Sequence, residues 1–215
     1  MILDEPVPPI VQGRSLMRRR AVLDAALDSF AERGFDTTSI EDICRGAETS
    51  VGSVYHHFGS KAGVAAALYL DVLEDFQRSL VGAMDAGPDA RRWIGSIVGA
   101  QLRWVEAHVA GARFLQQFRH AEWLAPSGAS LRALNAAFAA AIAEAARRHV
   151  RSGALRSSAP DIFIALLLGP THEFIRGWLA GRTTTPLGSA RRLLADACWH
   201  ALGASAVAPI DREKP

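Results

Sequence analysis

The sequence of 215 residues predicts an all-α fold, in which a small N-terminal domain of three helices in helix-turn-helix order precedes a larger C-terminal helical domain. Apolar residues recur every three or four positions along most of the chain, the period of a helix with one buried face. Glycine, proline and serine separate the expected helices, and no segment alternates as a strand does. We therefore expect a flexible arm at 1–13, the helix-turn-helix domain at 14–61, the C-terminal domain at 62–205 and a tail at 206–215.

The first two helices are indicated by their start and stop residues. The first is expected to begin at Ser15 and to end just before Gly34, because glycine commonly follows the last helical residue. Thr38 and Glu41 have the spacing of a capping box, in which a hydroxyl and a carboxylate satisfy free amides at a helix start. A short second helix should run from there to about Arg45.

A third short helix and a long fourth one follow after a turn. We expect the third helix over 51–57, with Thr49 or Ser50 as its N-cap. Ser60 is placed to cap the fourth helix, whose apolar residues repeat every three or four positions until it ends near 87–88. Its length indicates a connector between the two domains.

Five further helices are expected in the C-terminal domain, at 90–109, 112–124, 130–150, 161–180 and 187–202. The segment IFIALLLG at 162–169 is apolar around the whole helix circumference, which places it in the core or in a subunit interface. Together with the apolar residues of the last helix, it can complete a four-helix bundle between two subunits. The sequence therefore predicts a homodimer formed through the last two helices.

Residues 37–68 carry the most specific motif in the chain. They combine a hydroxyl at the start of the second helix, a short turn, a third helix of small residues ending in Tyr-His-x-Phe, and a Ser-Lys pair that opens the fourth helix. This stretch closely resembles the DNA-binding signature of the TetR/AcrR family of transcription regulators. The resemblance rests on Ala47, Ser50, Gly52, Tyr55, His56, Phe58, Ser60 and Lys61. It implies a repressor that binds palindromic operator DNA as a homodimer and that a small-molecule effector releases.

The candidate DNA contacts follow from this resemblance and from helix-turn-helix geometry. A recognition helix lies in the major groove, where small residues let its backbone approach the base edges. Tyrosine, histidine, lysine and helix-start hydroxyls can donate to phosphate oxygens and so fix the register on the duplex. The candidate DNA-binding residues are Thr37, Thr38, Ser50, Val51, Gly52, Ser53, Tyr55, His56 and Lys61.

Total charge does not by itself mark the N-terminal domain as DNA-binding. Residues 1–61 hold seven Lys or Arg and nine Asp or Glu, a formal charge of −2, although the whole chain carries +2. Positive charge is instead expected to act by its placement at the start of the first helix. This basic cluster consists of Arg14, Arg18, Arg19 and Arg20. Glu48 and Thr49 stand where the family usually has glycine and a small apolar residue, and the Glu48 carboxylate should repel phosphate.

The resemblance also implies a double-stranded DNA partner and an effector that binds inside the C-terminal helices and shifts the fourth helix. Such an effector acts only through its differential affinity for two states. Aromatic side chains at helical spacing are numerous enough to line an apolar pocket, which favours a lipophilic or aromatic effector. The candidate ligand-binding residues are Trp93, Trp104, Phe114, Gln117, Phe118, His120, Trp123, Phe138, His172 and Trp178.

Other functional classes find little support in the sequence. It contains no Gly-rich phosphate loop, nucleophile elbow or zinc-protease motif, so we expect no enzyme, no cofactor and no metal. Cys44 and Cys198 lie far apart and are expected to be buried, reduced thiols. The apolar stretches are too short to cross a bilayer, so we expect a cytoplasmic protein without a membrane partner. Two alternatives stay open: the same fold acting through protein contacts without specific DNA binding, and a metal-responsive sensor.

Overall fold

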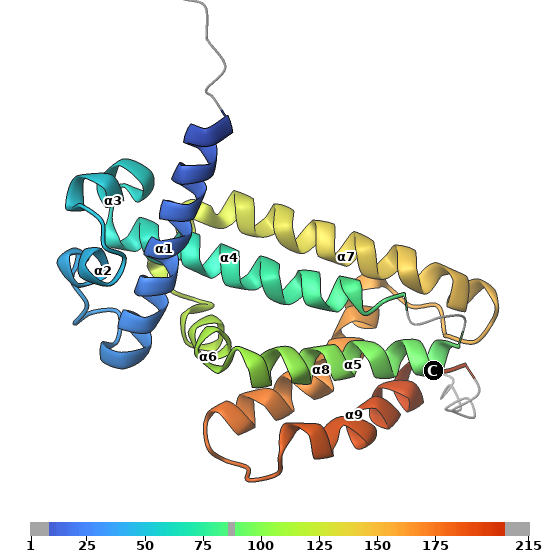
Figure 1. Ribbon diagram of the computed structural model, residues 1–215. Helices are drawn as coiled ribbons and strands as arrows, with labels where there is room; N and C mark the ends of the chain where they lie inside the picture. Colours follow the sequence, from blue (N-terminus) through green and yellow to red (C-terminus); the bar gives the residue numbers. More distant parts are fainter. Residues whose placement is uncertain (1–8, 86–88, 205–215) are drawn as a thin grey trace, which may run out of the picture. The chain divides into compact units, whose positions relative to one another are not determined.

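The structure, a computed structural model, describes residues 9–85 and 89–204, with side chains from Ser15 onward. Every regular element in this part of the chain is a helix, which confirms the all-α prediction (Figure 1). The elements are α1 (Pro9–Arg33), α2 (Ile40–Gly46), α3 (Val51–Phe58), α4 (Lys61–Gly82), α5 (Ala90–Ala107), α6 (Val109–Phe118), the 3-10 helix η1 (Glu122–Ser127), α7 (Gly128–Arg151), α8 (Pro160–Leu179) and α9 (Leu187–Leu202). None of these helices has the length and apolarity needed to pass through a lipid bilayer.

The chain folds into two compact units that are interleaved in sequence. The first unit combines residues 1–72 with 114–128, and the second combines 73–113 with 129–215. The first unit therefore holds α1, α2, α3, the first half of α4, part of α6 and η1. Residues 114–128 are distant in sequence from the rest of this unit, and the sequence pattern gave no indication that they belong to it.

Helix α1 is longer than its sequence pattern predicted, because it begins at Pro9 rather than at Ser15. Proline is tolerated in the first turn of a helix, since the amide proton that it lacks would have no partner there. The helix ends at Arg33 as expected, and Gly34 then adopts a φ of +84°, a left-handed conformation that favours glycine. Residues 1–8 of the expected arm, and the expected tail, lie outside the described residues.

Two predicted helices end earlier than expected. The helix expected at 112–124 is divided, because α6 ends at Phe118 and η1 begins only at Glu122. The residues between them include no glycine, proline or serine that would have indicated the break. Helix α4 stops at Gly82 and continues into a turn, several residues before the expected end.

The capping box of α2 lies one residue later than predicted. Ser39, not Thr38, is the N-cap: its hydroxyl accepts from the Asp42 amide at 3.1 Å, and the Asp42 carboxylate accepts from the Ser39 amide at 3.1 Å. The Thr38 hydroxyl is buried and donates to the carbonyls of Gly34 at 2.7 Å and Ser29 at 3.1 Å. Because this hydroxyl already bonds to the end of α1, it does not cap α2.

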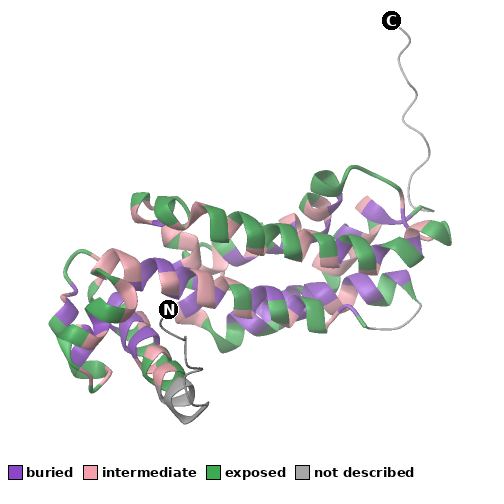
Figure 2. Ribbon diagram, turned by 90° about the horizontal axis from the view of Figure 1, so that it is seen from above, coloured by how far each residue is buried: buried purple, intermediate pink, exposed green. Residues whose placement is uncertain are grey.

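The core of the first unit forms where one face each of α1, α2, α3 and α4 is buried (Figure 2). Its members are apolar residues at helical spacing: Val22, Leu23, Ala26, Phe30, Ile40, Ile43, Val54, Val64, Ala65 and Leu68. Cys44 also lies in this core as a free thiol, and burial raises its pKa. This shared core fixes the place of α3 on the unit.

The second unit is built around α5, which packs against α8 and α9. Among its most deeply buried side chains are Trp93, Ile94, Ile97, Leu102, Ile142, Leu167 and Leu202. Cys198 is a second free, buried thiol, and burial raises its pKa to about 11. Three large apolar side chains stay exposed among the described residues of this unit: Val81 on α4 at 40%, Ile162 on α8 at 53% and Leu193 on α9 at 70%.

We expect Ser39→Ala to lower the free energy of unfolding by about 1 kcal/mol, because it leaves the Asp42 amide without its capping acceptor. Urea denaturation followed by circular dichroism measures this loss. Thr37→Ala is the matched control, since Thr37 is exposed and its hydroxyl makes no hydrogen bond within the described residues. The control should change stability by less than about 0.5 kcal/mol. Equal losses in both variants would contradict the assignment of the cap.

Candidate functional site

Helix α3 presents four of the nine predicted DNA contacts on one exposed face. Val51 is 37% exposed and Tyr55 is 51% exposed, and Gly52 and His56 are exposed beside them. The opposite side of the helix is held by Val54, which is completely buried. A side chain at Gly52 would meet no atom within 4 Å, so the backbone is open to close approach at this point.

The two ends of α3 are fixed by local hydrogen bonds. Of the two residues predicted as possible N-caps, Thr49 and Ser50, Ser50 is the cap, and its hydroxyl accepts from the Ser53 amide at 3.2 Å. At the other end Gly59 has a φ of +75° and donates its amide to the Tyr55 carbonyl at 2.9 Å. Ser50 and Ser53 therefore form the capping hydrogen bond at the start of α3. The Ser50 side chain stays exposed, and that of Ser53 is partly exposed.

The junction between α3 and α4 is too tight for any side chain at Gly63. A Cβ atom there would lie 1.9 Å from the Phe58 carbonyl oxygen, far inside van der Waals contact. The Ser60 hydroxyl accepts from the Gly63 amide at 2.9 Å, which confirms Ser60 as the cap of α4. The start of α4 thus sets the position of the end of α3.

Lys61 is surrounded by backbone carbonyls. Its ammonium donates to the carbonyl oxygens of Phe35 at 2.9 Å, Asp36 at 3.2 Å and Thr38 at 2.9 Å, and it lies 4.6 Å from the centre of the Phe35 ring. An ammonium has three protons, so each has an acceptor within the protein. This carbonyl clamp, formed by Lys61 with the 35–38 loop, joins the end of α1 to the start of α4. The phosphate contact expected of Lys61 stays a prediction.

The two threonines predicted at the start of α2 differ in availability. Thr37 is exposed, whereas the Thr38 side chain is buried and its hydroxyl is shared between two carbonyls of the first unit. A phosphate could therefore meet the Thr37 hydroxyl without any rearrangement. The structure assigns Thr38 to the link between α1 and the 35–38 loop.

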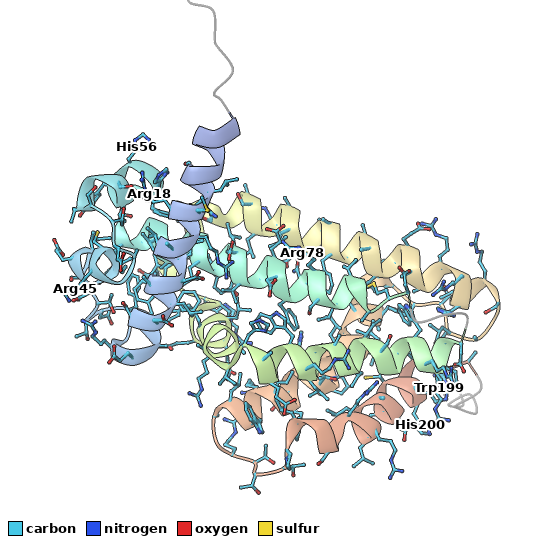
Figure 3. The ribbon with its side chains drawn as sticks, in the orientation of Figure 1. Arg18, Arg45, His56, Arg78, Trp199 and His200 are labelled. Carbon is cyan, nitrogen blue, oxygen red and sulfur yellow. The ribbon has the colours of Figure 1, made fainter. Side chains whose placement is uncertain are left out.

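The basic cluster of α1 is partly neutralised. Arg20 pairs with Asp24 and with Asp71, both at 2.9 Å, and the Arg19 guanidinium lies 4.0 Å from Asp71. Arg19 also lies over the Phe58 ring at 5.8 Å. Arg18 is exposed and has no carboxylate partner within the described residues, and Figure 3 shows it at the same end of the first unit as His56. The Arg14 side chain lies outside the described residues.

The Asp42 carboxylate of α2 forms ion pairs with two arginines. Asp42 accepts from Arg33 at 2.9 Å and from Arg45 at 3.0 Å, besides its bonds to Ser39. The hydrogen bonds from Ser39 and then the arginine contacts hold the pKa of the Asp42 carboxyl well below its usual range. Glu48, by contrast, is exposed and has a φ of +49°, which explains why glycine is usual in this turn.

Three predicted ligand contacts belong to the first unit instead. Phe114, Phe118 and Trp123 form an aromatic cluster with Phe30 and Phe35. Ring centres lie 5.9 Å apart for Phe30 and Phe114, and 5.4 Å apart for Phe35 and Trp123. This cluster ties 114–128 to the end of α1 and to the loop that the Lys61 ammonium holds. In the same segment the other two predicted contacts, Gln117 and His120, are exposed.

The remaining predicted ligand contacts lie in the second unit. The Trp104 indole donates to the Asp75 carboxylate at 2.7 Å, and its ring lies 5.0 Å from that of Phe76, which also lies 6.0 Å from His172. Trp93 is fully buried beside His149, with ring centres 5.4 Å apart. The last two candidates, Phe138 and Trp178, are partly exposed.

Sequence reasoning missed two buried polar residues of the second unit, Gln101 and Thr171. Both are 0% exposed, and neither the Gln101 amide nor the Thr171 hydroxyl has a hydrogen-bond partner among the residues that the structure describes. A signal was present, since Gln101 occupies a buried position of α5 one turn before Trp104. Gln101 interrupts the apolar face of α5, and the spacing of the aromatic residues gave no indication of it.

Comparison with known proteins connects the N-terminal region to one family. Residues 22–68 match the family described as bacterial regulatory proteins, tetR family. Over 104 residues the chain is 32% identical to the HTH-type transcriptional repressor KstR2 of Rhodococcus jostii, covering 48% of this chain and 51% of that relative. Over 92 residues it is 33% identical to the HTH-type transcriptional regulator BetI of Klebsiella pneumoniae, covering 42% and 47%. The chain thus spans about half the length of the curated relatives it matches.

Solved structures resemble this chain over most of its length. A TetR family transcription regulator from Marinobacter aquaeolei aligns with a TM-score of 0.72 at 20% identity, covering 89% of this chain and 98% of its own. FadR from Bacillus subtilis, in complex with stearoyl-CoA, aligns with a TM-score of 0.72 at 13% identity, covering 88% and 99%. At such identities the likeness concerns the fold alone.

We expect Lys61→Met to lower the free energy of unfolding by about 2 kcal/mol, because it keeps the aliphatic stem and removes the charge-assisted bonds to three carbonyls. Chemical denaturation at pH 7 measures the change. Arg103→Met is the control, since Arg103 is an exposed cation that makes no hydrogen bond or ion pair with the described residues. A Lys61 variant as stable as the control would show that the carbonyl clamp contributes nothing.

The Asp42 carboxyl should make stability depend on acidity. Its folded pKa is lowered, so its contribution is present above the unfolded pKa, near 3.9, and is lost as pH falls toward the folded value. The melting temperature of Asp42→Asn should therefore lie below that of the unmodified protein at pH 7, and the gap should narrow only below about pH 4. Thermal melts between pH 7 and pH 3 test this. A gap that already closes between pH 7 and pH 5 would refute it.

Proposed function

Because residues 22–68 belong to the tetR family of bacterial regulatory proteins and the chain has the fold of TetR-family transcription regulators, we propose that this protein is a ligand-responsive transcription repressor. It binds palindromic operator DNA as a homodimer, and a small-molecule effector releases it. The observation that carries the proposal is the exposed face of α3, where Val51, Gly52, Tyr55 and His56 lie together.

This face has the size and chemistry that a recognition helix needs. The major groove admits one helix, and small side chains at its start permit contact between backbone and base edges. Val51 and Gly52 supply that contact surface, with Ser50 and Ser53 beside them. Tyr55 and His56, one turn later, donate to phosphate oxygens and set the register.

Further phosphate contacts come from α1 and α2. The Arg18 guanidinium, at the same end of the unit as His56, supplies an exposed positive charge (Figure 3). The exposed Thr37 hydroxyl supplies a donor near the start of α2. Lys61 acts through the carbonyl clamp, by holding α4 and the 35–38 loop in the arrangement that orients α3. Local placement of charge thus offsets the acidic balance of the domain.

Two copies of the chain pair through α8 and α9. Ile162 and Leu193 are exposed apolar side chains on these two helices, and burying them against a second copy removes them from water. A two-fold axis between the copies places two α3 helices on successive half-sites, about 10 base pairs or a multiple of that apart. The effector is bound by the second unit, and stearoyl-CoA in the FadR neighbour supports an apolar ligand.

Selection of operator sequences from a random DNA pool tests the DNA-binding function directly. We expect a palindromic winner, and we expect Tyr55→Phe to weaken its binding by about tenfold, since one phosphate hydrogen bond is lost. Tyr69→Phe is the control, because Tyr69 is buried in the first unit, away from the α3 face. If no sequence is enriched and both variants behave like the unmodified protein, the fold acts through protein contacts instead.

The salt dependence of operator affinity separates the two roles of Lys61. If the ammonium acts through the carbonyl clamp, Lys61→Met lowers affinity but leaves the slope of log K against log salt unchanged. Arg18→Met, which removes a phosphate contact, should flatten the slope by about one unit. A Lys61 variant that flattens the slope in the same way would instead place its ammonium on phosphate.

A further inference from the structure

A groove on the second unit runs along α9 beside the start of α5. These two helices lie side by side (Figure 1), and the groove between them has a volume of about 480 Å³. Its charged lining residues are Arg91, Arg92, Arg191, Arg192, Asp89 and Asp196. Four arginines against two aspartates give this lining a formal charge of +2, so the groove attracts anions.

The two aspartates of the groove are already engaged. Asp89 is the N-cap of α5, and its carboxylate accepts from the backbone amides of Arg91 at 2.8 Å and Arg92 at 3.1 Å. The Asp196 carboxylate accepts from the Arg91 guanidinium at 2.7 Å. The Arg92 amide at Asp89 and the Arg91 guanidinium at Asp196 are the main causes that lower the pKa of these two carboxyls. Of the four arginines, only Arg91 is thereby neutralised by a direct ion pair.

The other three arginines keep their guanidinium donors available. Arg92, Arg191 and Arg192 are exposed, and no side chain of the three forms a hydrogen bond or an ion pair with any residue that the structure describes. Asp89 acts on Arg92, and Asp196 on Arg192, only through longer-range attraction. A guanidinium presents five N–H donors in a planar fork that fits the oxygens of a phosphate group. The groove therefore offers more donors than its own acceptors use.

Arg191 lies close to a further positive charge. A Cβ atom at Gly99 of α5 would lie 2.7 Å from the Arg191 Nε atom and 2.9 Å from a terminal nitrogen of Arg103. The two cations thus converge on one point of α5, where the absence of a side chain leaves them room. Glu106, one turn after Arg103, forms no ion pair with either of them. Two like charges at this separation repel each other, and a bound anion would relieve that repulsion.

The groove and the exposed apolar residue of α9 lie on different sides of that helix. Arg191 and Ala195 face α5, since a Cβ atom at Gly95 would lie 4.0 Å from the Ala195 Cβ atom. Leu193 follows Arg191 by two positions, which places it roughly 200° around the helix. Pairing of two copies through Leu193 is therefore compatible with an accessible groove.

We propose that this groove is a binding site for a small molecule that carries a diphosphate group, with Arg92, Arg191 and Arg192 as its anchors. A diphosphate brings two or more negative charges, which balance the formal charge of the lining, and its oxygens accept from guanidinium groups of both helices. The volume lies within the range of about 300–1,000 Å³ usual for ligand pockets, so the rest of the molecule has room. The bound ligand links α5 to α9. This inference is independent of DNA binding by α3.

Calorimetric titration with inorganic pyrophosphate at constant ionic strength tests the site. Arg191→Met should weaken binding at least tenfold, because it removes charge-assisted hydrogen bonds to the anion. Arg132→Met is the matched control, since Arg132 is an exposed arginine of α7 that makes no hydrogen bond or ion pair with the described residues and does not line the groove. This control should bind like the unmodified protein. Equal weakening in both variants, or no binding by the unmodified protein, overturns the proposal.

Gly99→Ala separates a built site from attraction by net charge. The added methyl group displaces the guanidinium groups of Arg191 and Arg103, while every charge stays in the chain. Alanine is the better helix former and the displaced atoms are the ends of flexible side chains, so α5 should keep its fold, which a thermal melt checks. We expect the affinity for pyrophosphate to fall about tenfold. Affinity equal to that of the unmodified protein would show that net charge alone attracts the anion, and the proposal would fail. If this variant does not fold, Arg191→Met and its control still decide.

Discussion

The orientation of α3 depends on one short-range electrostatic interaction, the convergence of three backbone carbonyls on the Lys61 ammonium. Carbonyls at the end of a helix and in the following loop lack partners of their own, and a cation at this point satisfies several of them at once. The same residue is the first of α4, whose first turn presses Gly63 against the Phe58 carbonyl. Loop, α4 and the end of α3 are therefore fixed to one another through only a few atoms. The exposed face of α3 is a consequence of that arrangement, as much as of its own side chains.

The aromatic side chains divide between two tasks that the sequence does not distinguish. Phe114, Phe118 and Trp123 pack with Phe30 and Phe35 and so extend the core of the first unit, next to the carbonyls that Lys61 holds. Trp104 instead donates its indole proton to the Asp75 carboxylate, and its ring packs against the Phe76 ring. In the second unit, the buried indole of Trp104 thus has a hydrogen-bond partner, whereas the side chains of Gln101 and Thr171 have none among the described residues. Buried polar groups are nearly always paired, so Gln101 and Thr171 are exceptions within a largely apolar core.

Local signals predicted most of the fold, and non-local contacts account for what they missed. The bounds of α9, the Ser50 and Ser60 caps and the glycine after α1 depend on neighbouring residues alone, and each was predictable from the sequence. The shift of the α2 cap from Thr38 to Ser39 was not predictable, because adjacent hydroxyls are equivalent until one of them meets the carbonyls of α1. The grouping of 114–128 with the first unit depends on aromatic contacts between distant segments. The exposed face of α3 followed from the family signature, whereas the burial of Thr38 and the clamp at Lys61 required the three-dimensional arrangement.

The state of the two cysteines has a practical consequence for measurement. Cys44 and Cys198 are the only cysteines in the sequence, both are buried, and burial disfavours the reactive thiolate of each. Neither thiol is accessible to an alkylating reagent while the chain is folded. A maleimide dye or spin label should therefore react only with a single cysteine introduced on the surface. Cys44 and Cys198 need not be replaced first. A label placed in this way can test the proposed pairing of two copies, with and without a candidate ligand, on a chain whose core is unaltered.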